Sequence, residues 1–317
     1  MGDNRRLAPY SGGRFVLELD QNKAVGYVTS IDGGHFKSDT VQSLVGGRPG
    51  QTGGDFLVGR YPGKPKFDDI TITVGAAMSP AFWKWVEATV NNKPERRNGA
   101  LVGYDFNSKE RSRRTFSRAL ISEIGFPALD AATKASAIMT IKIAPENLEY
   151  KEGDNSALQH SQAQDEFKKQ KLWLTSNFRF SLDKFKGDDA LRTAKVEGFS
   201  IKQNVITNPM GNERYPRREV GRVELPQLQV SFSESALGRW MKWYEASVVK
   251  GNPEETNGVI TYLASDNSTE LMHLELGGVG LTSLEVDKYE AQKEGLARVK
   301  ATLYVESMKL VSGKGTA

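Results

Sequence analysis

The 317-residue sequence contains no cysteine, which excludes disulfides, thiolate catalysis and cysteine-ligated metal sites. It also lacks an apolar run approaching the roughly 20 residues needed to span a bilayer. The N-terminus, MGDNRRLAPYSGG, has no apolar core of a signal peptide, and Arg6 stands where N-myristoylation requires Ser or Thr. These absences fit a cytoplasmic protein without a membrane segment.

Residues that carry catalysis are also scarce. The sequence has three histidines, none at metal-ligand spacing from another: His35, His160 and His273. No G-x-S-x-G motif is present, and the glycines of Gly46–Gly54 lack the following lysine and the strand–loop–helix order of a phosphate-binding loop. We therefore predict no enzymatic activity, no cofactor and no metal site.

Composition indicates a globular protein, with 38% hydrophobic and 26% charged residues in a length that suits two domains. Residues 1–150 hold 20 basic and 16 acidic side chains, whereas residues 176–312 hold 18 and 19. The basic excess lies in Lys93–Arg118, with eight basic and three acidic residues. This segment predicts either a basic patch facing an acidic partner or, more commonly, a solvated strand face and turn.

The chain is organised around the stretch Thr71–Val90, an alternating strand end followed by a helix. Ser79 is the expected N-cap and Pro80 the first helical residue. Helical spacing places four apolar residues on one face: Phe82, Trp85, Val86 and Val90.

The same unit returns 158 residues later. Leu228–Phe232 alternates like a strand, and the helix after it places apolar residues on one face, namely Leu237, Trp240, Met241, Tyr244 and Val248. We predict a core role for Phe82, Trp85, Trp240 and Tyr244. Trp83 and Trp243 fall off the apolar faces, and they are predicted to contact a neighbouring subunit, where tryptophan is enriched.

The repeat predicts a mainly β protein with two tandem antiparallel sandwich or barrel domains, each with about seven strands and one helix. The expected units are an N-terminal arm (1–13), domain 1 (14–150), a linker (151–174), domain 2 (175–312) and a tail (313–317). Polar, helix-forming composition predicts a helix within the linker, from about Ser156 to Lys171. Two long loops are expected at residues 43–66 and 202–221, the first rich in Gly and Pro.

The order of motifs resembles the inner tail-tube proteins of T4-type contractile phage tails and bacterial contractile injection systems. The first half shows an opening strand, a basic Tyr/Pro element, the alternating strand, the Trp helix and a Phe-Pro turn: Phe15–Leu19, Arg60–Gly63, Ile70–Val74, Trp85 and Gly125–Asp130. The second half repeats this order without Phe-Pro: Phe180–Leu182, Arg214–Pro216, Leu228–Phe232, Trp243 and Gly280–Glu285.

The resemblance implies a structural role in a ring of six tube-type domains, whose sheets join edge to edge around a lumen for DNA or protein cargo. Arg60, Tyr61, Arg214 and Tyr215, in the long loops, would contact neighbouring subunits or rings. Because the domain is duplicated, a trimer or a hexamer of chains is possible, as main tube or as an initiator or adaptor at baseplate or cap. Neighbouring tube, baseplate or sheath proteins would be partners, in a particle assembled in the bacterial cytoplasm.

Two other classes of function remain open from the residues. One is a duplicated β-barrel that binds a ligand, which an apolar-lined cavity in each domain would support. The other is a secreted effector on a tube-type fold, which a titratable cluster in a cleft would support.

Overall fold

The computed structural model describes residues 12–20, 23–45, 57–157, 173–185, 193–211, 213–287 and 297–313. The protein is mainly β, as predicted. Most of the predicted linker helix, from Ser156 to Lys171, lies outside the described residues, as do the arm up to residue 11 and the tail from residue 314.

The first half contains eleven strands and one helix among its described residues. They are β1 (Arg14–Leu19), β2 (Lys23–Val28), β3 (Ser30–Gly33), β4 (Phe36–Val45), β5 (Leu57–Phe67), β6 (Ile70–Val74), α1 (Pro80–Val90), β7 (Arg97–Tyr104), β8 (Glu110–Phe126), β9 (Leu129–Asp130), β10 (Met139–Ala144) and β11 (Asn147–Glu152).

The second half contains eight strands and a short helix among its described residues. They are β12 (Trp173–Leu182), the 3-10 turn η1 (Asp183–Phe185), β13 (Thr193–Val196), β14 (Phe199–Asn208), β15 (Arg217–Glu224), β16 (Leu228–Ser233), the 3-10 turn η3 (Glu234–Ala236), α3 (Leu237–Tyr244), the π turn η4 (Glu245–Val249), β17 (Thr256–Ala264), β18 (Glu270–Val286) and β19 (Arg298–Ser312).

Both halves repeat one strand order. The first half runs β1-β7-β8-β10-β6-β3 and the second β12-β17-β18-β19-β16-β13, with antiparallel pairing throughout. In each half the helix follows the strand in the fifth place, and a long hairpin precedes that strand. The sequence repeat is therefore also a repeat of topology.

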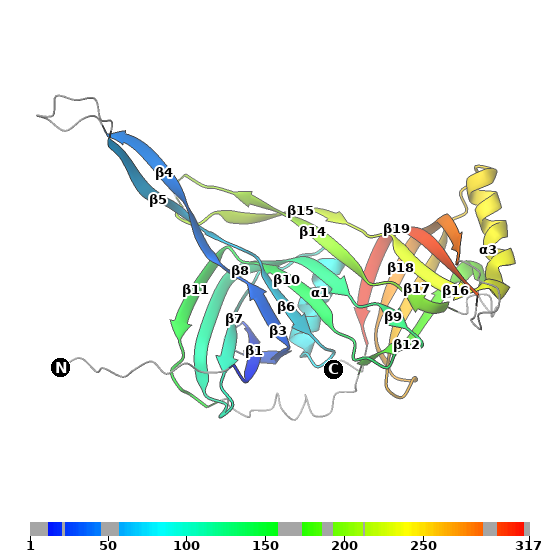
Figure 1. Cartoon of the computed structure of the whole chain (residues 1–317), viewed down its shortest axis with the longest axis horizontal. Coiled ribbons are helices and arrows are strands. Elements are labelled where there is room, and N and C mark those ends of the chain that lie inside the picture. Colours follow the sequence, from blue (N-terminus) through cyan, green and yellow to red (C-terminus); the bar gives the residue numbers. More distant parts are fainter. Residues whose placement is uncertain are drawn as a thin grey trace, which may run out of the picture.

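The two segments predicted as long loops are largely hairpins. β4 and β5 pair over most of residues 36–67, and β14 and β15 pair over residues 202–224. Figure 1 shows the β4–β5 hairpin extending beyond the first half at one end of the molecule, while α3 lies at the opposite end. Prolines at 62 and 65 are compatible with β5 because it belongs to a two-stranded sheet, where a missing N–H can face outwards.

The late-turn correspondence predicted for the second half is wrong. Gly280–Glu285 lies inside β18, which continues to Val286. In the first half Ile124 pairs with Ile141, one pair beyond a bulge, and in the second half Leu284 pairs with Ala301, also one pair beyond a bulge. Pairing register therefore makes Glu285, and not Gly280, the counterpart of Gly125.

The two helices occupy corresponding positions. Pro80 begins α1 after the N-cap Ser79, although the Ser79 hydroxyl makes no capping hydrogen bond. The indole N–H groups of Trp85 and Trp243 donate to the carbonyl oxygens of Glu95 and Glu254, each at 2.8 Å. A shared tertiary contact thus aligns the helices independently of the sequence repeat.

The hydrophobic core contains the residues that alternation and helical spacing placed inside. Ile70, Ile72 and Val74 of β6 are fully buried, as are their counterparts Leu228, Val230 and Phe232 of β16. The α1 face is buried as predicted, from Phe82 to Val90. In the second half, however, Met241 of α3 and Val248 of η4 were predicted to face the core but are 38% and 45% exposed, because no other described segment covers them.

Candidate functional site: the joint between the two halves

The two halves are joined by strand pairing rather than by a linker alone. β14 of the second half pairs antiparallel with the end of β8 in the first, matching Phe199 with Phe126 and Ile201 with Ile124. β9 of the first half pairs with β13 of the second, which adds Leu129 to that edge. Each sheet therefore continues from one half into the other, and the backbone groups of these edge strands are satisfied across the joint.

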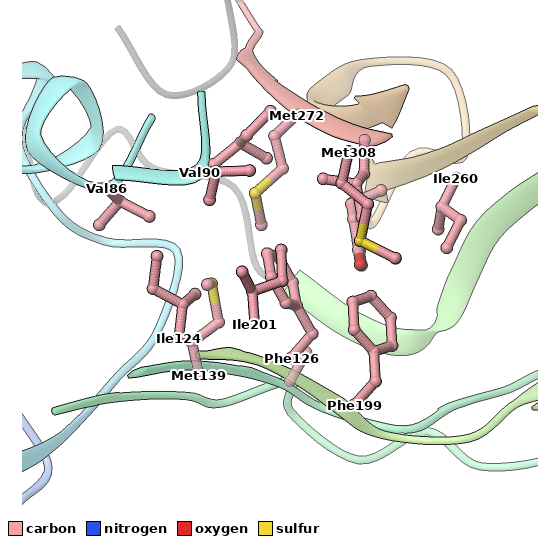
Figure 2. Packing of buried hydrophobic residues seen from close by; sticks show 14 of the residues in the cluster. Val86, Val90, Ile124, Phe126, Met139, Phe199, Ile201, Ile260, Met272 and Met308 are labelled. Atoms are coloured by element: carbon pink, nitrogen blue, oxygen red, sulfur yellow. The ribbon is translucent and has the colours of Figure 1, made fainter. Parts of the chain in front are cut away.

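The joint encloses an apolar core. Figure 2 shows Val86 and Val90 of α1 near Met272 and Met308 of the second half, with Ile201 of β14 below them. All five side chains are buried, with exposed fractions from 0% to 6%. Buried apolar area of this kind contributes roughly 25 cal/mol per Å², so the halves stabilise one another.

The C-terminal end of α1 is held to β19 by polar contacts. The Asn91 side chain donates Nδ2–H to the Leu310 carbonyl oxygen at 3.2 Å and accepts from the Leu310 N–H at 3.0 Å. One turn earlier, Glu87 accepts a hydrogen bond from the Ser312 hydroxyl at 3.0 Å. The side-chain amide of Asn91 thus hydrogen-bonds the backbone of Leu310 in β19 as a neighbouring strand would. The Leu310 side chain is fully buried.

A buried carboxylate anchors the β14–β15 hairpin on the first half. Glu146, whose side chain is 8% exposed, accepts from Arg118 Nε and from the backbone N–H of Arg218 at 3.1 Å. Arg96 Nε lies 3.5 Å from Glu146, and Arg96 Nη2 donates to the Arg218 carbonyl oxygen at 2.7 Å. The Arg218 guanidinium donates to the Phe67 carbonyl oxygen at 2.9 Å. Hydrogen bonds to charged groups contribute more than neutral ones, so this network is expected to fix the hairpin's position.

The hairpin turn also reaches the first half. Tyr215 stacks on Phe67 with ring centroids 6.0 Å apart, and Lys64 Nζ donates to the Met210 and Glu213 carbonyl oxygens at 2.7 and 3.0 Å. Tyr215, one of the predicted contact residues, therefore lies against a neighbouring tube-type unit of the same chain. Arg60 and Tyr61 lie exposed on β5.

The predicted placement of Trp83 and Trp243 is wrong. Both side chains are 1% exposed, and Trp243 packs against Phe185 and Trp240 inside its own half. Their indoles fill the layer between helix and sheet, because these helices turn a broad apolar surface inwards. Of the four residues predicted for the core, Phe82, Trp85 and Trp240 are fully buried and Tyr244 is partly buried against the same cluster.

Five of the six arginines in the basic segment Lys93–Arg118 form ion pairs with carboxylates, and one of them, Arg96, pairs with Glu219 of the second half. Arg113 donates to Glu110 and Glu18, Arg111 to Asp105, and Arg97 to Asp20 and Glu95. The hydrogen bond from Arg113 to Glu110 is the main reason that the pKa of Arg113 is raised, with the contact to Glu18 adding to it. Most arginines of the segment are therefore engaged in ion pairs, which favours the solvated strand face over a free basic patch.

Sequence reasoning missed the joint itself. Grooves of about 380 and 310 Å³ follow it on the polar side of the sheet, lined among others by Glu123, Lys142 and Lys202.

Among the residues that the structure describes, no group of three or more His, Asp or Glu could hold a metal ion. None of the helices in the described part of the chain is long and apolar enough to cross a membrane.

One family model matches the first half of the chain. Residues 12–149 match the family model described as T4-like virus tail tube protein gp19. The first half of the chain is therefore assigned to the T4-like tail tube family. The match covers the first half, and the second half repeats its strand order. The chain is accordingly a structural component of a phage tail or contractile injection particle rather than an enzyme.

Solved structures similar to this tail tube protein come from contractile injection systems. The anti-feeding prophage cap is 19% identical, covers 48% of this chain and 96% of its own, and gives a TM-score of 0.38. A tube component of the PVC sheath–tube complex in the extended state is 16% identical, with 47% and 94% covered and a TM-score of 0.36. A component of the anti-feeding prophage baseplate is 12% identical, with 43% and 92% covered and a TM-score of 0.35. No curated protein matches the chain.

Proposed function

We propose that this chain supplies two neighbouring positions of one ring of six tube-type domains, so that three chains close the ring around a central lumen. The observation that carries the proposal is the pairing of β14 with β8, because it continues the sheet of the first half sideways into the second. A stacked arrangement, with the halves in different layers, would not require such a lateral strand pair.

The proposed role is mechanical. A ring of this kind forms a rigid channel segment for DNA or protein cargo, and its partners are neighbouring tube, baseplate or sheath proteins. The tandem chain suits a specialised ring, such as an initiator or adaptor at the baseplate or a ring near the cap, where three identical chains could also meet a three-fold component. The two halves then act as two non-equivalent neighbours.

Mass measurement of the purified assembly tests the proposal, together with negative-stain microscopy. The expected particle has a mass of three chains of 35.0 kDa and shows a central hole. A ring that contains six chains would overturn the three-chain closure. A chain that stays monomeric up to high concentration, with no ring in the presence of its tube partners, would overturn the ring function itself.

A further inference from the structure

A single chain presents two open edges, each corresponding to one side of the internal joint. The first edge comprises Phe36, Lys37, Arg60 and Tyr150, which are all exposed on the first half. The second edge comprises Leu284–Val286, Val248–Val249, Glu255 and Glu306 on the second half. Figure 1 shows the β4–β5 hairpin of the first edge and helix α3 of the second at opposite ends of the molecule.

Pairing register shows which residue of the first edge corresponds to the joint. Ile31 pairs with Ile72 in the first half, and Val196 pairs with Val230 in the second, so these two pairs correspond. Five residues further along, Phe36 takes the place of Ile201. Ile201 is 3% exposed inside the joint, whereas Phe36 is 54% exposed. An aromatic side chain thus stands uncovered at a position that the joint buries.

The second edge has the matching partner position. Leu284 corresponds to Ile124, because each pairs with the next strand just after a bulge, and Val286 then corresponds to Phe126. Val286 is 45% exposed, whereas Phe126 is 3% exposed under Phe199. Since Ile201 pairs with Ile124 in the joint, the equivalent contact between two chains matches Phe36 with Leu284.

The helix side of the joint has the same open counterpart. Leu148 pairs with Phe116 and Met308 pairs with Leu276, so Tyr150 corresponds to Leu310 two residues later. Leu310 is fully buried under the end of α1, whereas Tyr150 is 53% exposed. In η4, which continues α3, Val248 and Val249 are 45% and 69% exposed, where α1 has the buried Val90. The exposed Val248 and Val249 on one edge and Tyr150 on the other are therefore the two sides of a second expected contact.

Charges on the two edges are complementary. Each hairpin contains a bulge, and the paired residues next to it are Pro65 in the first half and Val223 in the second. Arg60 and Arg218 each lie five residues before these positions, so Arg60 corresponds to Arg218. Glu306 corresponds to Glu146, the buried carboxylate that accepts the backbone N–H of Arg218, so the same geometry brings the backbone of Arg60, with its positively charged side chain, next to Glu306. Glu255 adds acidic charge near Glu306, because it accepts a hydrogen bond at 2.9 Å from the hydroxyl of Tyr304, which lies two residues before Glu306 on β19. Opposite charges of this kind select the orientation and partner of an interface.

We propose that the first edge of one chain binds the second edge of another copy, in the same geometry as the internal joint. This proposal rests on the ring function above and names the surface that closes the ring. The contact matches Phe36 with Leu284 and His35 with Glu285 in register, lays the end of α3 on Tyr150, and brings Arg60 to Glu306. The two joints differ chemically, because Glu146 is buried with arginines of its own half, whereas Glu306 depends on the neighbouring chain.

Engineered disulfides test the register directly, since the sequence has no cysteine. The test variant is His35→Cys with Glu285→Cys. The matched control is Ser200→Cys with Gly125→Cys, the corresponding pair inside the joint, where a Cβ at residue 125 would lie 3.4 Å from the Ser200 hydroxyl oxygen. Under mild oxidation the control should form a disulfide within one chain. The test variant should form covalent oligomers between chains that end at three chains.

The outcomes separate this proposal from the ring proposal. A three-chain ring by mass in which the test variant does not crosslink, while the control does, would overturn the proposed edge contact and leave the ring. Covalent oligomers that continue to six chains would support the edge contact and overturn closure by three. Mixing the two single-cysteine variants should give covalent dimers only.

A charge exchange provides a second test that needs no crosslink. Arg60→Glu should reduce the fraction of assembled rings at least tenfold at low salt, and Arg60→Glu combined with Glu306→Arg should restore it. Arg179→Glu makes the same charge change at an exposed residue of β12, away from both edges, and this variant should assemble like the wild type. Rings unaffected by Arg60→Glu, or equally weakened by Arg179→Glu, would overturn the assigned contact.

Discussion

The ring of Phe126 in the first half stacks on the ring of Phe199 in the second, with centroids 5.0 Å apart and planes 21° apart. The two residues are also backbone partners in the β8–β14 pair. Tyr262 continues the stack, 6.1 Å from Phe126. Because this aromatic stack spans both halves, we expect the two halves to unfold together.

Phe199→Ala should therefore destabilise the whole chain. A large-to-small change at a buried aromatic costs roughly 3–5 kcal/mol, and urea unfolding should show this loss in a single transition that includes both halves. A double-mutant cycle with Phe126→Ala should give a coupling of about 0.5–1.5 kcal/mol, as aromatic pairs do. Phe106→Ala is the control, because Phe106 is 76% exposed. Two separate transitions in the wild type would contradict the shared core.

The helix cores give a second prediction. Phe82→Ala and Trp240→Ala should each lower the free energy of unfolding by roughly 3–5 kcal/mol, since both side chains are fully buried. Met241→Ala lies on the exposed side of α3, next to Trp240, and should change stability little. Thermal melts that leave Phe82→Ala or Trp240→Ala unchanged would argue against the packing of that helix.

Local patterns in the sequence were sufficient for most of the fold. Alternation identified β6 and β16, helical spacing identified α1, and the repeat at a fixed offset identified two copies of one unit. The hairpins were missed because prolines and glycines in β5 read as a loop, although a two-stranded sheet tolerates them. Trp83 and Trp243 were misplaced because helical spacing alone does not show how wide the buried face of a helix is.

The joint could not be read from the sequence. Ile201 and Phe199 look like inward residues of any strand, and only the pairing with β8 shows that they cover a different half. Glu146 gives no signal either, because an isolated glutamate between strands predicts a solvated side chain. Its burial arises from Arg118 of its own half and from the Arg218 backbone of the other.

Alkaline pH should weaken the first half through Tyr104. Burial, with the nearby charges of Glu18 and Glu110, raises the pKa of Tyr104 to about 12, whereas an unfolded tyrosine titrates near ~10. The folded state thus holds its proton more tightly, so this contribution to stability is complete below about pH 10 and is lost as the pH rises towards 12. Urea unfolding between pH 8 and 12 should show a smaller loss of stability for Tyr104→Phe than for the wild type.

The control for this titration is Tyr150→Phe, because Tyr150 is 53% exposed. Its alkaline stability should follow that of the wild type. Identical pH profiles for Tyr104→Phe and the wild type would show that the hydroxyl of Tyr104 is not held in the protonated form by the fold.

The corresponding glutamates of the two edges give the sharpest contrast. Glu146→Gln removes the charge that receives Arg118 and the Arg218 N–H in a site where the side chain is 8% exposed, so the isolated chain should lose roughly 1.5–3 kcal/mol. Glu306→Gln makes the same chemical change at the corresponding exposed position, where the isolated chain should keep its stability. Urea unfolding of both variants, at concentrations below assembly, measures this difference. Only Glu306→Gln removes a charge from the contact between chains. Above the assembly concentration, this variant should therefore weaken ring formation without weakening the fold. Equal effects of the two variants on the isolated chain would show that the corresponding positions do not have the different environments on which the ring contact depends.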